Sequence, residues 1–454
     1  MRKFEKRFIL LLLAVLLAAA CAPAGGENSS PEPEVTTLIY ATLNPGQVNR
    51  MAVKQFNSQH EDVQIEVRDY SGLDENSSGG KNGRDRLLTE IMSGQIPDIM
   101  DFDGQLPYRQ MAEKGYLEDL WPYIENDPDL GRDGVLEAPL RAAEINGKLY
   151  TIFDSVTIRT LVGAESMVGN RTSWTIAELW EAFANMPENS TILEYYETRR
   201  SMFDHTFIMT LDSYVDWKTG HCSFDSEGFR ASLEFISNYP LEFECEWSTN
   251  EELTAEISRR RREGRQMLSE TAVGHFDYVQ ILDAEFGGRA AFIGYPVEDG
   301  SVGSSFHPKS VKLAISSTCQ DKEAAWDFVR QMLLPRIGSE QLERTFGEYM
   351  GVFPINRADY EKMKLQAGAL RNYKDREFYI FNSAVPLKLH AVTEDEFSRL
   401  ENFFNSIEKI DLCDSAIYDI VWDQAGPYFA GDKTLDETVE LIQRRVTLYV
   451  NEQK

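Results

Sequence analysis

The sequence predicts an α/β fold divided into two domains, and three features lead to this prediction. The chain has 454 residues, which is more than one hydrophobic core usually supports. Near its start, short β-branched segments alternate with helical segments, which is typical of a parallel sheet wrapped by helices. Further along, capping-box sequences before apolar stretches indicate the starts of helices. With 42% hydrophobic and 11% aromatic residues, the composition is that of a globular protein.

The first domain is expected to begin with three strands and two helices. Residues 36–41 are short and β-branched, residues 63–67 alternate between apolar and polar side chains, and residues 98–102 form a third short apolar segment. Between them, residues 48–56 and 87–92 carry apolar side chains at three- and four-residue spacing, which predicts helices. This order favours parallel strands joined by helical crossovers.

The middle and the end of the chain are expected to be more helical. Thr175 and Glu178 form a capping box, and Trp174 and Leu179 are placed to form the hydrophobic staple that accompanies it. A second capping box, at residues 434–437, begins the last helix, whose apolar stripe we assign to core packing. Further expected elements are a helix from Phe224, strands at 289–295 and 311–315, and a helix at 321–334.

The N-terminus has the features of an export signal. A cluster of basic residues at positions 2–7 precedes an apolar run at 8–17 that is too short for a stable membrane span. Three alanines and Cys21 follow, and this arrangement resembles the lipobox of bacterial lipoproteins, although Ala18 stands where leucine is usual. We therefore expect a signal peptide at 1–20, a lipidated Cys21 and a flexible tether at 21–35. The alternative is an ordinary secretory signal that contains a cysteine.

The net charge argues against nucleic-acid binding. It is −28 for the whole chain, and it becomes −31 without the leader, which holds four bases and one acid. A surface this acidic repels nucleic acid and anionic headgroups. The run Arg259–Arg262 lies among helix-forming acids, and we interpret it as a solvated helix face.

The cysteines and histidines give no metal or redox pattern. The cysteines after Cys21 lack the C-x-x-C spacing, and no two of the six histidines lie four residues apart as in a zinc helix. Cys222 and Cys245 either pair in an oxidising compartment or stay as buried thiols. We expect no metal and no cofactor.

Seven segments, in order across nearly the whole mature chain, resemble those of the sugar-type extracellular solute-binding proteins of bacterial ABC importers, the maltose-binding-protein-like family. They are Phe56–His60, Ser93–Ile99, Ile145–Tyr150, Trp174–Thr175, Phe292–Pro296, Lys322–Phe328 and Tyr428–Thr434. Each segment also has a structural explanation as a turn, cap or helix. Together they indicate the fold and do not identify the residues that bind a ligand.

The resemblance implies a two-lobed, periplasmic-binding-protein-like fold. Each lobe would be a mainly parallel sheet flanked by helices, and hinge strands would join them. Lobe 1 would comprise 36–152 and 294–350, and lobe 2 would comprise 153–293 and 351–454. The implied function is to bind a small solute, with a carbohydrate or oligosaccharide as the expected class, and to deliver it by lobe closure to the membrane permease of an ABC importer. We expect a monomer, anchored outside the cytoplasm.

Ligands of open α/β sheets bind beyond the carboxyl ends of the strands, and sugar recognition combines aromatic rings with polar side chains. These rules select Asn44, Asp101, Asp103, Asp154, Ser155, Trp217, Phe276, Asp277 and Tyr278 as candidate ligand contacts. The structural alternatives are that Asp101 and Asp103 shape a turn before Gly104, and that Phe276 and Tyr278 fill the core.

A membrane-anchored glycoside hydrolase is the alternative function. It requires two carboxylates at a defined separation, one of them with a raised pKa, and a chain with 74 acidic residues offers many pairs on paper. The sequence has no G-x-S-x-G nucleophile elbow and no phosphate-binding loop. A structural or adhesive lipoprotein would be expected to contain repeats, which are absent. We therefore expect a binding protein and not an enzyme.

Overall fold

The computed structural model describes residues 35–46, 50–71, 81–102, 106–194, 197–207, 210–242, 251–297, 300–309, 311–335, 351–369, 377–379, 386–411 and 415–452. The predicted signal peptide, the lipidation residue Cys21 and most of the tether lie outside these ranges. So do Asp103 and Cys245, and the predictions made for them stay predictions.

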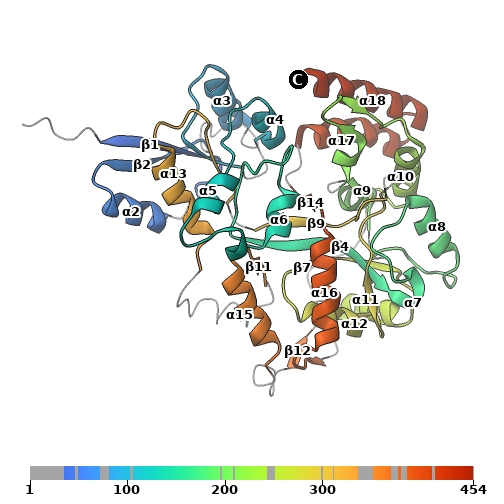
Figure 1. The fold of residues 1–454 in the computed structure, drawn as a ribbon. Helices are drawn as coiled ribbons and strands as arrows, with labels where there is room; N and C mark the ends of the chain where they lie inside the picture. Colours follow the sequence, from blue (N-terminus) through green and yellow to red (C-terminus); the bar gives the residue numbers. More distant parts are fainter. Residues whose placement is uncertain are drawn as a thin grey trace, which may run out of the picture.

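The strands and helices carry the labels of Figure 1. The strands are β1 (Thr36–Thr42), β2 (Val63–Asp69), β3 (Ile99–Asp101), β4 (Ser155–Ala164), β5 (Val215–Asp216), β6 (His221–Cys222), β7 (Leu268–Val273), β8 (Ala290–Phe292), β9 (Ser305–Pro308), β10 (Leu313–Ile315), β11 (Phe353–Pro354), β12 (Glu377–Tyr379), β13 (Pro386–Lys388) and β14 (Lys409–Ile410). The α-helices are α2 (Arg50–Gln59), α3 (Lys81–Met92), α4 (Tyr108–Glu113), α5 (Trp121–Asn126), α6 (Glu137–Ala142), α7 (Glu165–Val168), α8 (Ile176–Ala184), α9 (Arg199–Phe207), α10 (Glu227–Ser237), α11 (Glu251–Arg262), α12 (Tyr278–Glu285), α13 (Lys322–Val329), α15 (Arg357–Ala367), α16 (Glu394–Ser406), α17 (Ser415–Ala430) and α18 (Leu435–Glu452). Short 3-10 helices are η1 (Arg132–Gly134), η2 (Leu211–Tyr214) and η3 (Arg330–Met332).

A four-stranded sheet, called the first sheet below, has the order β10-β3-β1-β2. β1 pairs in parallel with both β2 and β3, as the strand–helix–strand pattern predicts. β10 returns from much later in the chain and pairs antiparallel with β3. The three strands and two helices expected at the start of the chain are therefore confirmed.

Helices cover both faces of the first sheet. On one face, the rings of Phe56 in α2 and Phe328 in α13 pack edge to face with centroids 5.7 Å apart, and Phe328 also contacts Tyr40 of β1. On the other face, Leu87 of α3 and Met111 of α4 share a buried cluster with Met100 of β3. The central strands β1 and β3 are therefore covered on both sides and contain no charged residue before Asp101, whereas the edge strand β2 exposes Glu66, Arg68 and Asp69.

The second sheet has six strands and is organised around β4, the longest strand of the described chain. β4 pairs antiparallel with β7, β8, β9 and β11, while β14 joins β9 in parallel. The expectation of a mainly parallel sheet is therefore wrong for this lobe. Four separate segments return to β4 from the opposite direction, and such long-range pairings leave no mark in local sequence periodicity.

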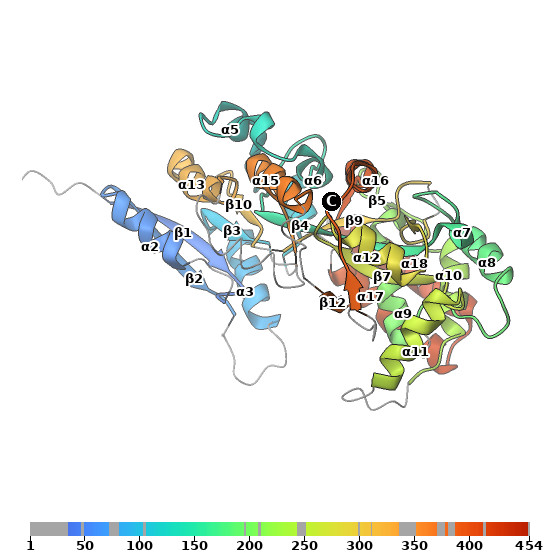
Figure 2. The ribbon, with the colours of Figure 1, turned by 90° about the horizontal axis from the view of Figure 1, so that it is seen from below.

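The two faces of β4 belong to different cores. Val156, Ile158 and Val162 point into the bridging core, a buried cluster that runs from Leu38 of the first sheet to Phe403 of α16. Helices α12, α15 and α16 cover this face, as Figure 2 shows from below. On the opposite face, Leu161 belongs to the lobe-2 core, formed with helices α8, α9, α10, α17 and α18. β4 thus joins the two halves of the molecule.

Phe276, expected to stack on a solute, lies in the bridging core and is 0% exposed. Its ring packs edge to face against Phe353, Tyr360 and Phe397, with centroid distances of 5.7, 5.4 and 4.9 Å. These contacts cover the ring and leave no face for a ligand. The structure gives Phe276 a packing role in place of the stacking role expected.

Both predicted capping boxes form. Thr175 Oγ1 accepts from the Glu178 N–H at 3.2 Å, and Glu178 Oε2 accepts from the Thr175 N–H at 2.8 Å. Thr434 and Glu437 make the same reciprocal pair at the start of α18. Trp174 is buried in the lobe-2 core, where its indole N–H donates to the Gly294 carbonyl at 2.9 Å.

Figure 1 shows the first sheet with α2, α3 and α13 at one end and α8, α10, α17 and α18 at the other, with the second sheet between them. The returning segment after Gly294, assigned as a whole to lobe 1, contributes β9 to the second sheet and β10 to the first. The lobe boundaries stay a prediction. Within the described residues, no helix is both long enough and apolar enough to cross a membrane.

Replacing Phe276 with alanine should lower the free energy of unfolding by about 3–5 kcal/mol, because it removes a buried ring and leaves a cavity. Leu365→Ala is the matched control, since Leu365 is 76% exposed on α15 and its loss should change stability by about 0.5 kcal/mol or less. Urea unfolding followed by circular dichroism measures both. Equal stability of the two variants would contradict the core position of Phe276.

Candidate functional site

The carboxyl ends of β1 and β3 bring two of the expected residues together. The register pairs Ala41 with Met100, so Thr42 and Asp101 follow side by side. Thr42 Oγ1 donates to Asp101 Oδ2 at 3.3 Å and accepts from the Asn44 N–H at 3.0 Å. Asp101 is 1% exposed, and its other oxygen accepts from the Lys312 N–H at 3.3 Å. Asp101 therefore holds the ends of β1, β3 and β10 together, while Asn44 lies half-buried at their edge.

Asp154 and Ser155 lie where the chain passes from the first lobe to β4. Ile152 still pairs with Leu313 of β10, whereas Ser155 already pairs with Pro354 of β11. Ser155 Oγ donates to Asp154 Oδ1 at 2.7 Å. These two residues therefore lie where the chain crosses from the first sheet to the second, as expected from the sequence. Ser155 is buried, and Asp154 is half-buried.

Three further expected residues lie where α12 begins: Phe276 and Asp277 precede the helix, and Tyr278 is its first residue. Asp277 Oδ2 lies 3.2 Å from His275 Nδ1, and both side chains are largely buried. Tyr278 is half-buried against the bridging core, and burial raises the pKa of its hydroxyl. Asp277 and Tyr278 are therefore partly buried, whereas Phe276 is fully buried.

Trp217 occupies the turn between β5 and β6. Asp216 builds this turn, because its carboxylate accepts from the backbone N–H groups of Lys218 and Thr219 at 3.0 and 3.1 Å. The indole is half-buried against the lobe-2 core. Across from it, the guanidinium carbon of Arg109 in α4 lies 5.9 Å from the ring centroid.

The sequence did not predict a cluster of charged residues on the second sheet. We call it the polar patch, and its members are Arg159, Glu197, His205, Glu270, His307 and Asp411. In the antiparallel register of β4 with β7 and β9, Leu161 pairs with Glu270, and Thr157 pairs with His307. Paired residues of adjacent strands direct their side chains to the same face of a sheet. Arg159 belongs to the same face of β4 as Leu161, since strand side chains alternate. Arg159 of β4, Glu270 of β7 and His307 of β9 therefore lie on one face of the second sheet.

Ion pairs connect the members of the polar patch. Arg159 lies between two carboxylates, 3.5 Å from Asp411 and 3.9 Å from Glu270. Asp411 Oδ2 also lies 2.6 Å from His307 Nδ1. The side chains of Arg159 and His307 are 29% and 31% exposed, so solvent reaches them. The patch thus combines fixed charges with access from outside.

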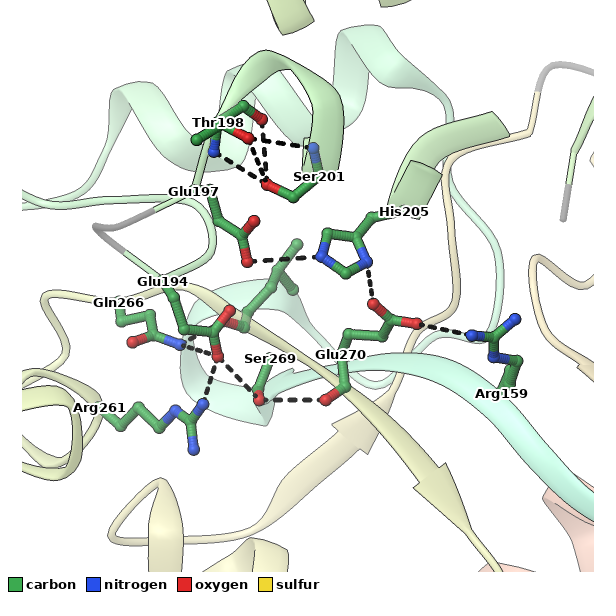
Figure 3. A network of polar contacts seen from close by, with 11 residues as sticks. Arg159, Glu194, Glu197, Thr198, Ser201, His205, Arg261, Gln266, Ser269 and Glu270 are labelled. Carbon is green, nitrogen blue, oxygen red and sulfur yellow. Dashed lines mark hydrogen bonds and ion pairs between the residues drawn. The ribbon is translucent and has the colours of Figure 1, made fainter. Parts of the chain in front are cut away.

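His205 joins α9 to the second sheet (Figure 3). One ring nitrogen contacts Glu270, and the other lies 3.5 Å from Glu197. Burial alone would lower the pKa of His205, but the hydrogen bonds to Glu197 and Glu270 outweigh it and raise the pKa to about 10. Burial would raise the pKa of Glu270, but His205 outweighs it, and the pKa is lowered. The pair is therefore an imidazolium and a carboxylate at neutral pH.

A second charged network, beside the polar patch, is structural. Arg261 is 7% exposed and ion-pairs with Glu194 and, at 3.1 Å, with Glu285 (Figure 3 shows Glu194). The prediction of a solvated face for Arg259–Arg262 is therefore wrong for Arg261. It holds for Arg259, which is exposed and paired with Glu256 and Glu263. Two members of the arginine run contact distant segments of the chain: Arg261 through its ion pairs with Glu194 and Glu285, and Arg260 by donating to the Asn189 carbonyl at 2.8 Å.

The described residues contain no group of three or more His, Cys, Asp or Glu side chains arranged to hold a metal ion. Cys222 is buried in the lobe-2 core, and its pairing with Cys245 involves a residue outside the described part of the chain.

No protein-family model matches the chain, and no curated protein matches it. Among solved structures, the sugar-binding protein MalE from the phytopathogen Xanthomonas citri is similar, with 15% sequence identity, a TM-score of 0.51, and coverage of 92% of this chain and 98% of that chain. An extracellular solute-binding protein of family 1 from Alicyclobacillus acidocaldarius has 15% identity, a TM-score of 0.47, and coverage of 92% and 99%. The likeness to MalE spans both sheets and confirms the predicted two-lobed α/β fold.

The raised pKa of His205 predicts the pH dependence of stability. In the unfolded chain the imidazole titrates near its ordinary value of 6.5, and in the folded protein near 10. Its contribution is therefore fully present below pH 6.5 and is lost as the pH rises to about 10. The difference in unfolding free energy between the wild type and His205→Gln should shrink across this interval.

The lowered pKa of Glu270 predicts the opposite sign for Glu270→Gln, which serves as the matched variant. Its contribution is present above the ordinary value of 4.5 and is lost as the pH falls through the lower value in the folded protein. Urea unfolding at a series of pH values measures both. A His205→Gln difference that stays constant from pH 6 to pH 10 would contradict the imidazolium.

Proposed function

We propose that this chain is an extracytoplasmic solute-binding protein that binds a small carbohydrate between its lobes and delivers it to an ABC importer. The observation that carries the proposal is the two-lobed fold, shared over 92% of the chain with a protein described as sugar-binding. Fold alone does not determine function, so the site has to supply the chemistry.

Polar side chains on both lobes support carbohydrate binding. Lobe 1 offers Asn44 at the carboxyl end of β1, and the crossing offers Asp154. Lobe 2 offers the polar patch, in which carboxylates, imidazoles and a guanidinium are partly exposed. Sugar hydroxyls are recognised by such groups, because each hydroxyl both donates and accepts a hydrogen bond. A neutral ring needs several of these contacts, and two lobes can supply them from opposite sides.

The patch is well prepared for this role because its charges are held in place. His205 fixes the orientation of Glu270 and Glu197, and Arg159 and His307 do the same for Asp411. Side chains that are already oriented lose little conformational entropy when a ligand binds. Closure of the lobes would then bring lobe 1 against the exposed side of the solute, in a hinge motion that shifts an equilibrium between open and closed forms.

The glycoside hydrolase alternative has less support from the carboxyl groups. A general acid needs a raised pKa, whereas His205 holds the pKa of Glu270 in the polar patch below its ordinary value. Burial raises the pKa of Glu285, but this carboxyl is 12% exposed and ion-paired with Arg261. Neither carboxyl has both the protonation and the access that the reaction requires.

The proposed location rests on the N-terminal residues. The basic start, the short apolar run and the alanines before Cys21 support an exported lipoprotein tethered at the membrane surface. Replacing Cys21 with alanine should move the protein from the membrane fraction to the soluble fraction of the cells that express it. A wild-type protein found only in the soluble fraction would contradict the anchor.

The proposed partner is a membrane permease, and the protein acts as a monomer.

The function is tested by a thermal-shift screen of the mature protein against mono- and oligosaccharides. A true ligand at about a hundred times its dissociation constant should stabilise the fold by about 2.7 kcal/mol. Chromatography of each stabilising sugar after long incubation should show it unchanged. Stabilisation by no saccharide would contradict the proposal, and appearance of cleavage products would favour the hydrolase.

A further inference from the structure

Arg109 and Trp217 approach each other from opposite lobes. Arg109 lies on α4, whose neighbouring residues Tyr108 and Met111 are buried against the first sheet. Trp217 lies on the β5–β6 turn and packs against the lobe-2 core. The guanidinium carbon is 5.9 Å from the ring centroid, which is the outer range of a cation–π contact. Arg109 of lobe 1 and Trp217 of lobe 2 are therefore in contact, and the helix or turn that carries each of them is fixed by its own core.

Among the described residues, Arg109 has no hydrogen bond and no ion pair, and its contact with Trp217 is the interaction that the structure gives it. Two other arginines that stack on tryptophan differ. Arg132 lies 4.2 Å from the Trp121 centroid and also pairs with Glu125 at 2.6 Å. Arg200 lies 4.0 Å from the Trp422 centroid and pairs with Asp204. Arg109 therefore differs from these two arginines in having no carboxylate partner among the described residues.

Trp217 provides a second unused donor at this position. Its indole Nε1 is buried and has no hydrogen-bond partner among the described residues. Buried N–H groups normally find an acceptor, because the loss of water is otherwise uncompensated. Arg109 and Trp217 thus place two kinds of N–H donor close together, without an acceptor from the protein.

We propose that Arg109 and Trp217 bind an anionic oxygen group of the solute, so that the substrate class is an acidic carbohydrate. This inference rests on the proposed function and specifies its solute. A guanidinium is suited to the task because its N–H groups match the two oxygens of a carboxylate or phosphate, and charge-assisted bonds are stronger than neutral ones. The adjacent indole would contribute its N–H to the same group and its face to the sugar ring.

The polar patch is compatible with an acidic solute because its carboxylates lie next to cationic side chains. Glu197 and Glu270 share the imidazolium of His205, and Asp411 lies between Arg159 and His307. These pairs reduce the repulsion that a chain this acidic would otherwise exert on an anion. The patch supplies contacts to hydroxyl groups, and the charge that recognises the anion comes from Arg109.

The inference is tested by isothermal titration calorimetry with sugars that share a ring and differ in charge. The probes are glucose, glucuronate and glucose 6-phosphate, together with galactose, galacturonate and oligomers of both uronates. At least one acidic probe should bind about tenfold or more tightly than its neutral partner, as expected for a charge-assisted contact. A preference for uronate identifies the anion as a carboxylate, and a preference for glucose 6-phosphate identifies it as a phosphate.

Variants assign the preference to the two residues. Arg109→Gln should remove most of the tenfold advantage of the acidic probe and leave the affinity for the neutral sugar within about threefold. Arg109→Lys keeps the charge without the planar fork and should retain part of the advantage. Trp217→Phe keeps an aromatic ring, lacks the N–H, and should weaken binding of the acidic probe. Thermal unfolding of each variant checks that the fold is intact.

Arg132→Gln is the matched control, because Arg132 also stacks on a tryptophan but already has carboxylate partners. It should bind every probe as the wild type does. Binding of neutral probes with no advantage for acidic ones, or an equal loss for both classes in Arg109→Gln, would overturn the inference and leave the proposed function standing. Binding of no probe at all would contradict both.

Discussion

The structure depends on a single strand, β4, whose two faces have different tasks. One face contributes Val156, Ile158 and Val162 to the bridging core, which continues into the first lobe. The other face contributes Leu161 to the lobe-2 core and then turns polar at Arg159. An arginine inside a central strand is tolerated only if its charge is compensated, because transfer of a charge from water into a protein interior is costly. Glu270 meets this requirement from the neighbouring strand β7, and Asp411 meets it from the residue directly after β14.

The same requirement extends outward from the strand. Glu270 needs a cation of its own, and His205 of α9 provides it, with Glu197 on the other side of the ring (Figure 3). Carboxylates and cationic side chains therefore lie next to one another in this cluster, within a strongly acidic protein. Because such networks hold several side chains in one arrangement, they are suited to present a preformed surface to a small polar molecule. Arg109 stands apart from this balance, since among the described residues it faces an aromatic ring and not a carboxylate.

Local sequence was enough to predict the first sheet and the two capping boxes, because strand alternation and cap chemistry depend on neighbours in the chain. It also placed Asn44 and Asp101 together, since the carboxyl ends of adjacent parallel strands meet at one edge. The antiparallel second sheet could not be predicted in this way, and the polar patch depends on it. Phe276 illustrates the same limit: a loop of aromatic and polar residues is compatible with a ligand site and with a core, and only the long-range contacts of its ring distinguish them. Arg261 shows that one member of a basic run can be buried while its neighbours are solvated.

If the two lobes close on a small polar solute, the distance between them should shorten when the solute binds. Met92 on α3 and Leu448 on α18 are exposed, at 79% and 59%, and belong to opposite lobes (Figure 1). Spin labels on cysteines at these two positions, in a mature chain with its native cysteines replaced by serine, report the separation by pulsed electron paramagnetic resonance. Lobe closure should shift the distance distribution to shorter values when a binding sugar is added. An unchanged distribution at a saturating concentration of that sugar would contradict it.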